Sequence, residues 1–437
     1  MKSSFQTIIL IVFIGAFVVA VVAFSGILGT GGSSTGTSSE PTGKVVVWGI
    51  LPYSIMQSYI SDFNAEGNEY TLEYEEHAPE TFYQDIIFAL ANNASPDVVI
   101  FSSEIFSQFK DKLYTIPYQA YTERTFRDTN IDGAQIFLTK EGVIGLPLAV
   151  DPLVVYYNKD ILSSQNFVIP PRTWTNLTQS VPLLTKRTAQ NTISQSTIAF
   201  GEADNISHYR DILSALFLQT GNAIVSPDPT TGSPTVTLTN GGSVGGGLPA
   251  ADALEFYTGF ANPTSASYSW NRSLPESLQQ FLAGKSAFYI GRASELFTIQ
   301  AQNPNLNFDV MELFQPTDAQ RSITYGSYIA AGVMNSAPNF TAAYAAVSAM
   351  SSAQGVDAIS KRASLPPARR DLLLVTQQNP YVSVFFKAAL SAFSWPDQNV
   401  TTTNSVFRAM IQNVNSGRSD AQTAIYEATR DLQTSAR

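Results

Sequence analysis

The sequence predicts an α/β fold with a mainly parallel sheet, and three observations lead to this prediction. Short apolar runs that suit buried strands alternate with segments whose apolar residues recur every three or four positions, as on one face of a helix. This alternation continues along the chain from residue 44, and it favours a parallel sheet covered by helices on both faces. Apolar residues make up 44% of the 437 residues, enough to bury more than one large core. A ligand is then expected beyond the carboxyl ends of the strands.

The first segment predicts a membrane anchor. Residues 8–24 are uncharged and apolar, and residues 26–28 extend them to about the 20 residues with which a helix crosses a bilayer. A secretory signal peptide has a shorter apolar core and a cleavage site of small residues, and no clean site follows here, so we expect residues 1–28 to stay attached. Lys2 precedes the span and residues 29–41 carry no positive charge, which favours a cytoplasmic N-terminus and an extracellular body.

Residues 29–43 have the composition of a flexible Gly/Ser/Thr linker, and the folded body is expected to begin at Lys44. The strands that end at Trp48 and Phe101 should present their following loops to the ligand cleft. In chain order, the expected elements are a strand at 45–48, a helix at 55–64, a strand at 70–74, a helix at 82–90, strands at 97–101 and 153–157, a helix at 209–217, a surface hairpin or loop at 226–249, a helix at 275–282, strands at 287–290, 308–313 and 329–334, a helix at 340–350, and mainly helix in the last hundred residues.

Composition excludes several functional classes. The chain carries 25 Lys and Arg against 35 Asp and Glu without a basic run, so no nucleic acid partner is expected, because phosphates are bound by clustered cations. The absence of cysteine excludes disulfides, thiolate metal sites, cysteine nucleophiles and a lipid-modified N-terminal cysteine. His77 and His208 are the two histidines, which leaves little material for a zinc site or a Ser-His-Asp triad. We therefore expect neither a metal nor a cofactor.

Five short segments of the folded body carry a family resemblance. They read ANNASPDVV at 91–99, GLPLAVD at 145–151 continuing to YYNKD at 156–160, PRTW at 171–174, FLAGKSA at 281–287 and LPPARRD at 365–371. In order and spacing they resemble the extracellular solute-binding proteins of family 1, the group that includes maltose-binding protein and serves ABC importers. The resemblance extends from about residue 44 to the end of the chain.

The resemblance implies a two-lobed, periplasmic-binding-protein-like fold, in which crossing strands form a hinge and the ligand binds in the cleft between the lobes. It divides the chain into lobe 1, residues 44–150 plus about 327–375, and lobe 2, residues 151–326 plus about 376–437. The crossings are then expected near Val150 and Ser327.

Asp151 is the first candidate for the binding site. It follows an apolar segment, where a charge is costly unless it is paired or faces a wet cleft. The alternative is a structural carboxylate that caps the hinge through hydrogen bonds to backbone amides. The family resemblance also places Trp48, Ser103 and Glu104 at the ligand, where hydroxyls and carboxylates bond sugar hydroxyls and an aromatic ring stacks on the sugar. Ser103 and Glu104 have N-capping of the next helix as their alternative.

The candidates of lobe 2 and the hinge depend more strongly on the resemblance. The segment around His208 and Tyr209 precedes a long helix, at a place where the family often contributes ligand groups. Where maltose-binding protein offers a Trp, this chain has Arg292, which weakens a maltodextrin assignment; it either binds an anionic group or is a solvated surface residue. Trp395 is either a platform in the cleft or a packed loop anchor. The ligand-binding candidates are Trp48, Ser103, Glu104, Asp151, Tyr209, Arg292, Tyr325, Ser327 and Trp395.

The leading functional prediction is a non-catalytic receptor that is anchored in the cell membrane and faces outward. It captures a carbohydrate or related polar solute and presents it to the permease subunits of an ABC importer. The alternative is an extracellular enzyme of the glycoside hydrolase type, for which Glu104, Asp151 and Glu202 are the available carboxylates. A third class, an adhesion or scaffold protein, would show no closure on a ligand. Because no motif supports catalysis, we do not expect an enzyme.

Overall fold

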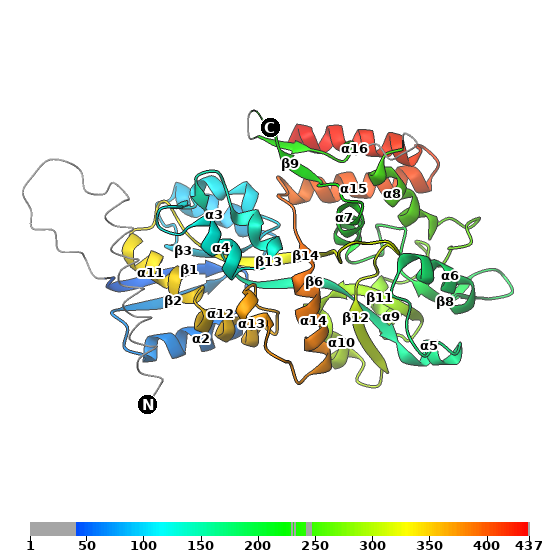
Figure 1. The fold of residues 1–437 in the computed structure, drawn as a ribbon, viewed down its shortest axis with the longest axis horizontal. Coiled ribbons are helices and arrows are strands. Elements are labelled where there is room, and N and C mark those ends of the chain that lie inside the picture. Colours follow the sequence, from blue (N-terminus) through cyan, green and yellow to red (C-terminus); the bar gives the residue numbers. More distant parts are fainter. Residues whose placement is uncertain (1–40, 229, 231–232, 242–246, 436–437) are drawn as a thin grey trace, which may run out of the picture.

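The computed structural model describes residues 41–228, 230, 233–241 and 247–435, which form two lobes joined by long strands (Figure 1). The predicted anchor at residues 1–28, and the predicted linker up to residue 40, lie outside the described residues. Within the described ranges, every helix is too short or too polar to cross a bilayer.

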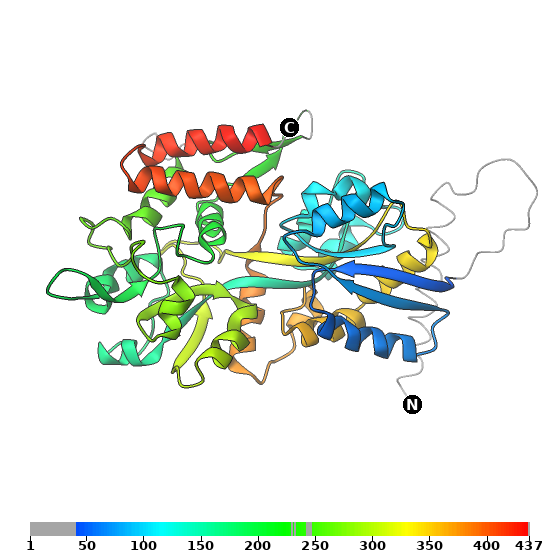
Figure 2. The same cartoon turned by 180° about the vertical axis from the view of Figure 1, so that it is seen from behind.

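Lobe 1 is built on three parallel strands, β1 (Gly43–Gly49), β2 (Tyr70–Glu76) and β3 (Val98–Ser102), with β1 between the other two. Every residue of β3 is buried, as its uninterrupted apolar run predicts. Helix α3 (Phe82–Ala91) lies on one side of these strands, and α2 (Tyr53–Ala65) and α12 (Ala353–Ala363) lie on the other (Figures 1 and 2). The other described elements of this lobe are η1 (Phe106–Gln108), η2 (Lys110–Lys112), β4 (Ile116–Pro117), α4 (Glu123–Thr129), η3 (Asp132–Phe137), β5 (Gly142–Val143), α11 (Phe340–Met350) and α13 (Arg370–Leu373).

Two long strands, β6 (Leu146–Asn158) and β13 (Thr324–Val333), run from one lobe to the other (Figure 1). They pair in antiparallel orientation, with Ser327 opposite Asp151. The hinge strands therefore bring together two segments that lie far apart in the sequence.

At this point of the hinge strands, the side chains stop packing into the core of one lobe and begin to pack into the core of the other. On β6, Val150 packs into the core of lobe 1 and Leu153 into the core of lobe 2. On β13, Tyr328 belongs to the core of lobe 1 and Tyr325 to that of lobe 2. This distribution supports crossings near Val150 and Ser327, and the residue boundaries of the lobes remain a prediction.

Lobe 2 buries both faces of its sheet. Strand β6 alternates between two cores, because Leu153 and Val155 face one of them while Val154 and Tyr156 face the other. Its strands also include β7 (Lys186–Arg187), β8 (Ile193–Ile198), β11 (Ser286–Arg292) and β12 (Phe308–Glu312). The helices are α5 (Lys159–Ser164), α6 (Trp174–Leu184), α7 (Tyr209–Gln219), α8 (Pro249–Gly259), α9 (Ser277–Leu282), η4 (Ala293–Glu295), α10 (Leu296–Gln302), α15 (Val400–Asn415) and α16 (Ala421–Ser435).

The chain passes between the lobes once more through α14 (Pro380–Leu390) and β14 (Ala392–Phe393) (Figure 1).

The prediction of a hairpin or loop at 226–249 is confirmed in part, because β9 (Val225–Pro227) and β10 (Pro234–Val236) pair in antiparallel orientation. The glycine-rich residues 242–246 lie outside the described residues. Helix α6 is capped by Thr173, whose side chain accepts a hydrogen bond from the backbone amide of Asn176.

The prediction of a mainly parallel sheet is wrong for the main sheet as a whole. Its strands lie in the order β2-β1-β3-β13-β6-β11-β8-β7, with β12 on β6 and β14 on β13. The pairs β1/β2, β1/β3, β8/β11 and β13/β14 are parallel, while β3/β13, β13/β6, β6/β11, β6/β12 and β7/β8 are antiparallel. The reason is that β6 leaves lobe 1 and β13 returns to it, so both run against the strands that they join. The carboxyl ends of β1 and β3 in lobe 1, and of β8 and β11 in lobe 2, still point toward the junction of the lobes.

Candidate functional site

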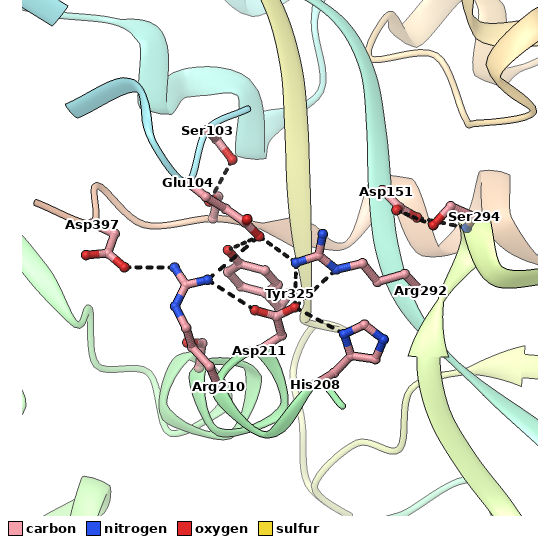
Figure 3. A network of polar contacts seen from close by, with 12 residues as sticks. Ser103, Glu104, Asp151, His208, Arg210, Asp211, Arg292, Ser294, Tyr325 and Asp397 are labelled. Atoms are coloured by element: carbon pink, nitrogen blue, oxygen red, sulfur yellow. Dashed lines mark hydrogen bonds and ion pairs between the residues drawn. The ribbon is translucent and has the colours of Figure 1, made fainter. Parts of the chain in front are cut away.

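Charged side chains from both lobes meet at this junction (Figure 3). Glu104 lies just after β3 in lobe 1, and Arg292 is the last residue of β11 in lobe 2. Arg210 and Asp211 lie in the first turn of α7, and Tyr325 comes from the hinge strand β13. The strand ends therefore place both acids and bases at the edge where an α/β sheet is expected to bind its ligand.

Arg292 is the centre of this network. Its Nη2 lies 2.5 Å from Oε1 of Glu104 and 2.6 Å from Oδ2 of Asp211. The Nε of Arg292 also donates to the same Asp211 oxygen at 3.1 Å, so one oxygen of Asp211 accepts two hydrogen bonds from one edge of the guanidinium. The hydroxyl of Tyr325 donates to Oε1 of Glu104 at 3.2 Å. Lobe 1, lobe 2 and the hinge are thus joined through one guanidinium and one carboxylate.

Arg210 forms a second, more deeply buried part of the network. Its Nη2 donates to Oδ2 of Asp397 at 2.8 Å, and its Nη1 lies 3.4 Å from Oδ1 of Asp211. The side chains of Arg210, Asp211 and Asp397 are 8%, 5% and 1% exposed, respectively. Nε of Arg210 is buried without a hydrogen-bond partner among the described residues. Such buried charges are tolerated only when they are paired, which explains why the arginines and acids lie interleaved.

The pKa values of the network follow from this pairing. Burial opposes the ionised form of Asp211, but Arg292, His208 and Arg210 outweigh it and hold the pKa of Asp211 well below its usual range. Burial likewise opposes the charge of Arg292, yet Asp211 and Glu104 raise the pKa of Arg292 well above its ordinary value. Both groups therefore stay charged at neutral pH.

His208 is charged at neutral pH as well. Burial by itself lowers its pKa, but the carboxylates of Asp211 and Glu295 outweigh burial and the repulsion from Arg292, and raise the pKa of His208 to about 9. Its Nε2 lies 3.1 Å from Oε2 of Glu295, and its Nδ1 lies 3.7 Å from Oδ2 of Asp211. His208 thus connects the first turn of α7 with the 3-10 helix η4.

We expect the protein to lose stability in mildly alkaline solution because of His208. Its pKa of about 9 in the folded protein lies above the unfolded value of 6.5, so the stabilisation is complete below pH 6.5 and disappears as the pH rises through 9. The difference corresponds to about 3 kcal/mol. Urea unfolding between pH 6 and 10 measures this loss. His208→Gln should remove most of this pH dependence, and an equal decline in both proteins would contradict the assignment.

Asp151 occupies the hinge beside this network. Its Oδ1 accepts the backbone N–H of Ser294 at 3.0 Å, and its Oδ2 accepts the Ser294 hydroxyl at 2.7 Å. The residue is 8% exposed, and burial raises the pKa of its carboxyl while Arg292 opposes the rise. These bonds tie β6 to the start of η4, as the structural alternative for Asp151 predicts. A role in ligand binding remains a prediction.

Two further candidates, Ser103 and Ser327, are buried serines. Ser103 is fully buried; its hydroxyl accepts the backbone N–H of Tyr328 at 3.0 Å and lies 3.0 Å from the hydroxyl of Ser394. Neither this contact nor the pairing of Glu104 is the N-cap that was the alternative for both residues. Ser327 is 5% exposed on the hinge opposite Asp151.

Three aromatic candidates are engaged in contacts of their own. The half-buried ring of Trp48 lies 4.3 Å from that of His77, measured between centroids. The hydroxyl of Tyr209 donates to the backbone oxygen of Asn404. Trp395 is 4% exposed and its Nε1 donates to the hydroxyl of Ser214 at 3.1 Å, which favours the packed loop anchor over a platform in the cleft.

Sequence reasoning missed Arg210, Asp211, Glu295 and Asp397. A signal for the first two was present, because they are adjacent opposite charges at the start of the otherwise uncharged helix at 209–219. The interpretation of Arg292 as a solvated surface residue is wrong, since its side chain is 22% exposed and paired with two carboxylates. The described residues hold no cluster of His, Asp and Glu arranged to bind a metal ion.

The three carboxylates considered for a hydrolase are each engaged by protein donors. Glu104 is paired with Arg292, Asp151 accepts two bonds from Ser294, and Oε2 of Glu202 lies 3.3 Å from Nη2 of Arg272. A glycosidase uses two carboxyl groups that face each other across the scissile bond. These pairings give no support to the hydrolase alternative.

Comparison with known proteins identifies similar chains. Residues 58–383 match the model of a family described as bacterial extracellular solute-binding protein. A cyclo/maltodextrin-binding protein solved with maltotetraose is similar in structure, with a TM-score of 0.73 at 17% identity over 91% of this chain and 98% of the other.

Two further solved structures are similar over almost their whole length. The cyclic α-maltosyl-1,6-maltose-binding protein of Arthrobacter globiformis has a TM-score of 0.73 at 16% identity, covering 90% of this chain and 98% of its own. The GacH receptor of Streptomyces glaucescens, solved unliganded and with acarbose, has a TM-score of 0.65 at 19% identity, covering 90% and 99%. At these identities the likeness shows the two-lobed fold.

Proposed function

Because this chain belongs to the bacterial extracellular solute-binding proteins, we propose that it captures a carbohydrate or related polar solute between its lobes and presents it to the permease subunits of an ABC importer. The observation that carries the proposal is the meeting of polar side chains from both lobes at the carboxyl ends of their strands. Similar structures were solved with maltotetraose, mannobiose and tagatose, which supports a saccharide as the solute.

The proposed binding groups are Glu104, Arg292 and Tyr325, with Asp151 at the hinge. Carboxylates and guanidinium groups form charge-assisted hydrogen bonds, which suit the many hydroxyl groups of a sugar. Trp48, Ser103, Tyr209, Ser327 and Trp395 remain further candidates.

We further propose that residues 1–28 anchor the protein in the membrane with its body outside the cell. An uncleaved anchor keeps the receptor near its permease without a lipid-modified cysteine, and the chain has no cysteine. The intact mass of the membrane-extracted protein tests the anchor: a chain that begins near residue 26 or later would contradict it.

We expect a bound saccharide to raise the melting temperature. A ligand at a hundred times its Kd stabilises the folded state by about 2.7 kcal/mol, because it binds that state alone. A thermal-shift screen with mono- and oligosaccharides measures the effect, and calorimetry followed by recovery of the unchanged sugar separates binding from turnover. The absence of a shift with every saccharide class would contradict a sugar as the solute, and release of a product would indicate an enzyme.

A further inference from the structure

We propose that Glu104 is an interlobe latch: in the absence of solute its carboxylate holds lobe 1 against Arg292 of lobe 2, and the lobes open when it is released. Figure 3 shows Glu104 approaching Arg292 and Tyr325, and Oε1 of Glu104 also lies 3.8 Å from Nη1 of Arg210, a second cation of lobe 2. The inference concerns the unliganded protein, and it holds whatever the chemical class of the solute.

Six charged side chains of lobe 2 balance one another without Glu104. The cations Arg210, Arg292 and protonated His208 lie among the carboxylates of Asp211, Glu295 and Asp397. All six come from lobe 2, through the first turn of α7, the end of β11 with η4, and the loop before α15. The cluster therefore stays paired when the lobes separate, and Glu104 is the added charge that lobe 1 supplies.

Arg292 keeps its partner when Glu104 leaves. Asp211 accepts bonds from both Nε and Nη2 of Arg292, at 3.1 and 2.6 Å. The Glu104 and Arg292 side chains are 17% and 22% exposed, whereas Asp211 is 5% exposed. Water can thus reach both partners of the Glu104 contact on opening, which lowers the cost of breaking it, while the Asp211 contact stays buried.

The direction of opening follows from the position of the hinge. The contact between Glu104 and Arg292 lies against the first turn of α7, because Arg292 also pairs with Asp211. Helices α3, α7 and α16 lie on the same side of β6 and β13 (Figure 1). Release of Glu104 should therefore move α3 away from α16. This makes the distance between these two helices the appropriate measure of the latch.

The full chain suits a two-label distance measurement because it contains no cysteine. Gln84→Cys on α3 and Gln422→Cys on α16 place one spin label on each lobe, at exposed positions outside the network. Electron–electron double resonance on the unliganded, detergent-solubilised protein then gives the distribution of distances between the lobes. The doubly labelled chain is the reference for each added substitution.

Glu104→Gln in this background should shift the distribution to longer distances. Raising the salt concentration from 0.05 to about 1 M should lengthen the distance in the reference protein and leave the Glu104→Gln distribution unchanged, because salt screens the ion pair. Tyr325→Phe removes one hydrogen bond to Glu104 and should give a smaller shift in the same direction, and this variant tests the latch if Glu104→Gln folds poorly.

Glu202→Gln is the matched control. Glu202 is also an ion-paired glutamate, with a 6% exposed side chain, but its partner Arg272 belongs to the same lobe. Its substitution should leave the distance distribution at the reference. Unchanged distributions in both Glu104→Gln and Tyr325→Phe would overturn the latch, as would an equal shift in Glu202→Gln.

Discussion

Replacing Arg210 with methionine is expected to lower the free energy of unfolding by about 3–5 kcal/mol, because it leaves buried carboxylates without their cation. Asp397 is 1% exposed and receives its ion pair from Nη2 of Arg210 at 2.8 Å. Asp211 retains Arg292 and His208, so most of the loss arises at Asp397. Burial already raises the pKa of Asp397 against the effect of Arg210, and without that guanidinium the carboxyl is expected to take up a proton.

Urea unfolding followed by tryptophan fluorescence measures this effect, and Arg430→Met is its control in the same lobe. Arg430 pairs with Asp431 on the surface of α16, with side chains 72% and 50% exposed, so its loss should change stability by less than about 1 kcal/mol. Combining Arg210→Met with Asp397→Asn should recover part of the loss, since the unpaired charge is then absent. If Arg210→Met unfolds like Arg430→Met, the buried network contributes little to stability.

The sequence was sufficient for the parts of the fold that local patterns determine. The apolar run of β3 and the helical spacing of α2 predict their elements closely, and the end of β3 marks Glu104, which lies at the junction of the lobes. The pairing of Glu104 with Arg292 was beyond local reasoning, because it joins residues 188 positions apart across two lobes. The family resemblance supplied both residues as separate candidates, without indicating that they bind each other.

The prediction of the strand directions was wrong for a related reason. Alternation of strand and helix is the same whether the chain returns to its own sheet or leaves for another lobe, so β6 and β13 could not be recognised as antiparallel from their apolar composition. Trp395 shows the same limit at a single residue. The sequence left a cleft platform and a packed loop anchor open for it, because its partner Ser214 lies 181 positions away in the sequence.

Trp395→Ala is therefore expected to destabilise the protein by about 3–5 kcal/mol, as truncation of a buried tryptophan does. The indole stacks on Phe407 with ring centroids 6.4 Å apart. Cζ of Arg210 also lies over the indole, 5.7 Å from the ring centroid. Its Nε1 also loses the hydrogen bond to the buried Ser214 hydroxyl.

Trp395→Phe separates the two roles that remain open for this residue. Phenylalanine keeps an aromatic ring for Phe407 and Arg210 but removes the indole N–H, so it should retain most of the stability lost in Trp395→Ala. Urea unfolding of both variants, with calorimetry on any saccharide found in the thermal-shift screen, distinguishes the roles. A packed anchor predicts a large loss of stability in Trp395→Ala and unchanged affinity in Trp395→Phe. A stacking platform predicts the reverse, a stable Trp395→Ala protein with weakened binding, because a ring that faces solvent in the empty cleft contributes little to folding.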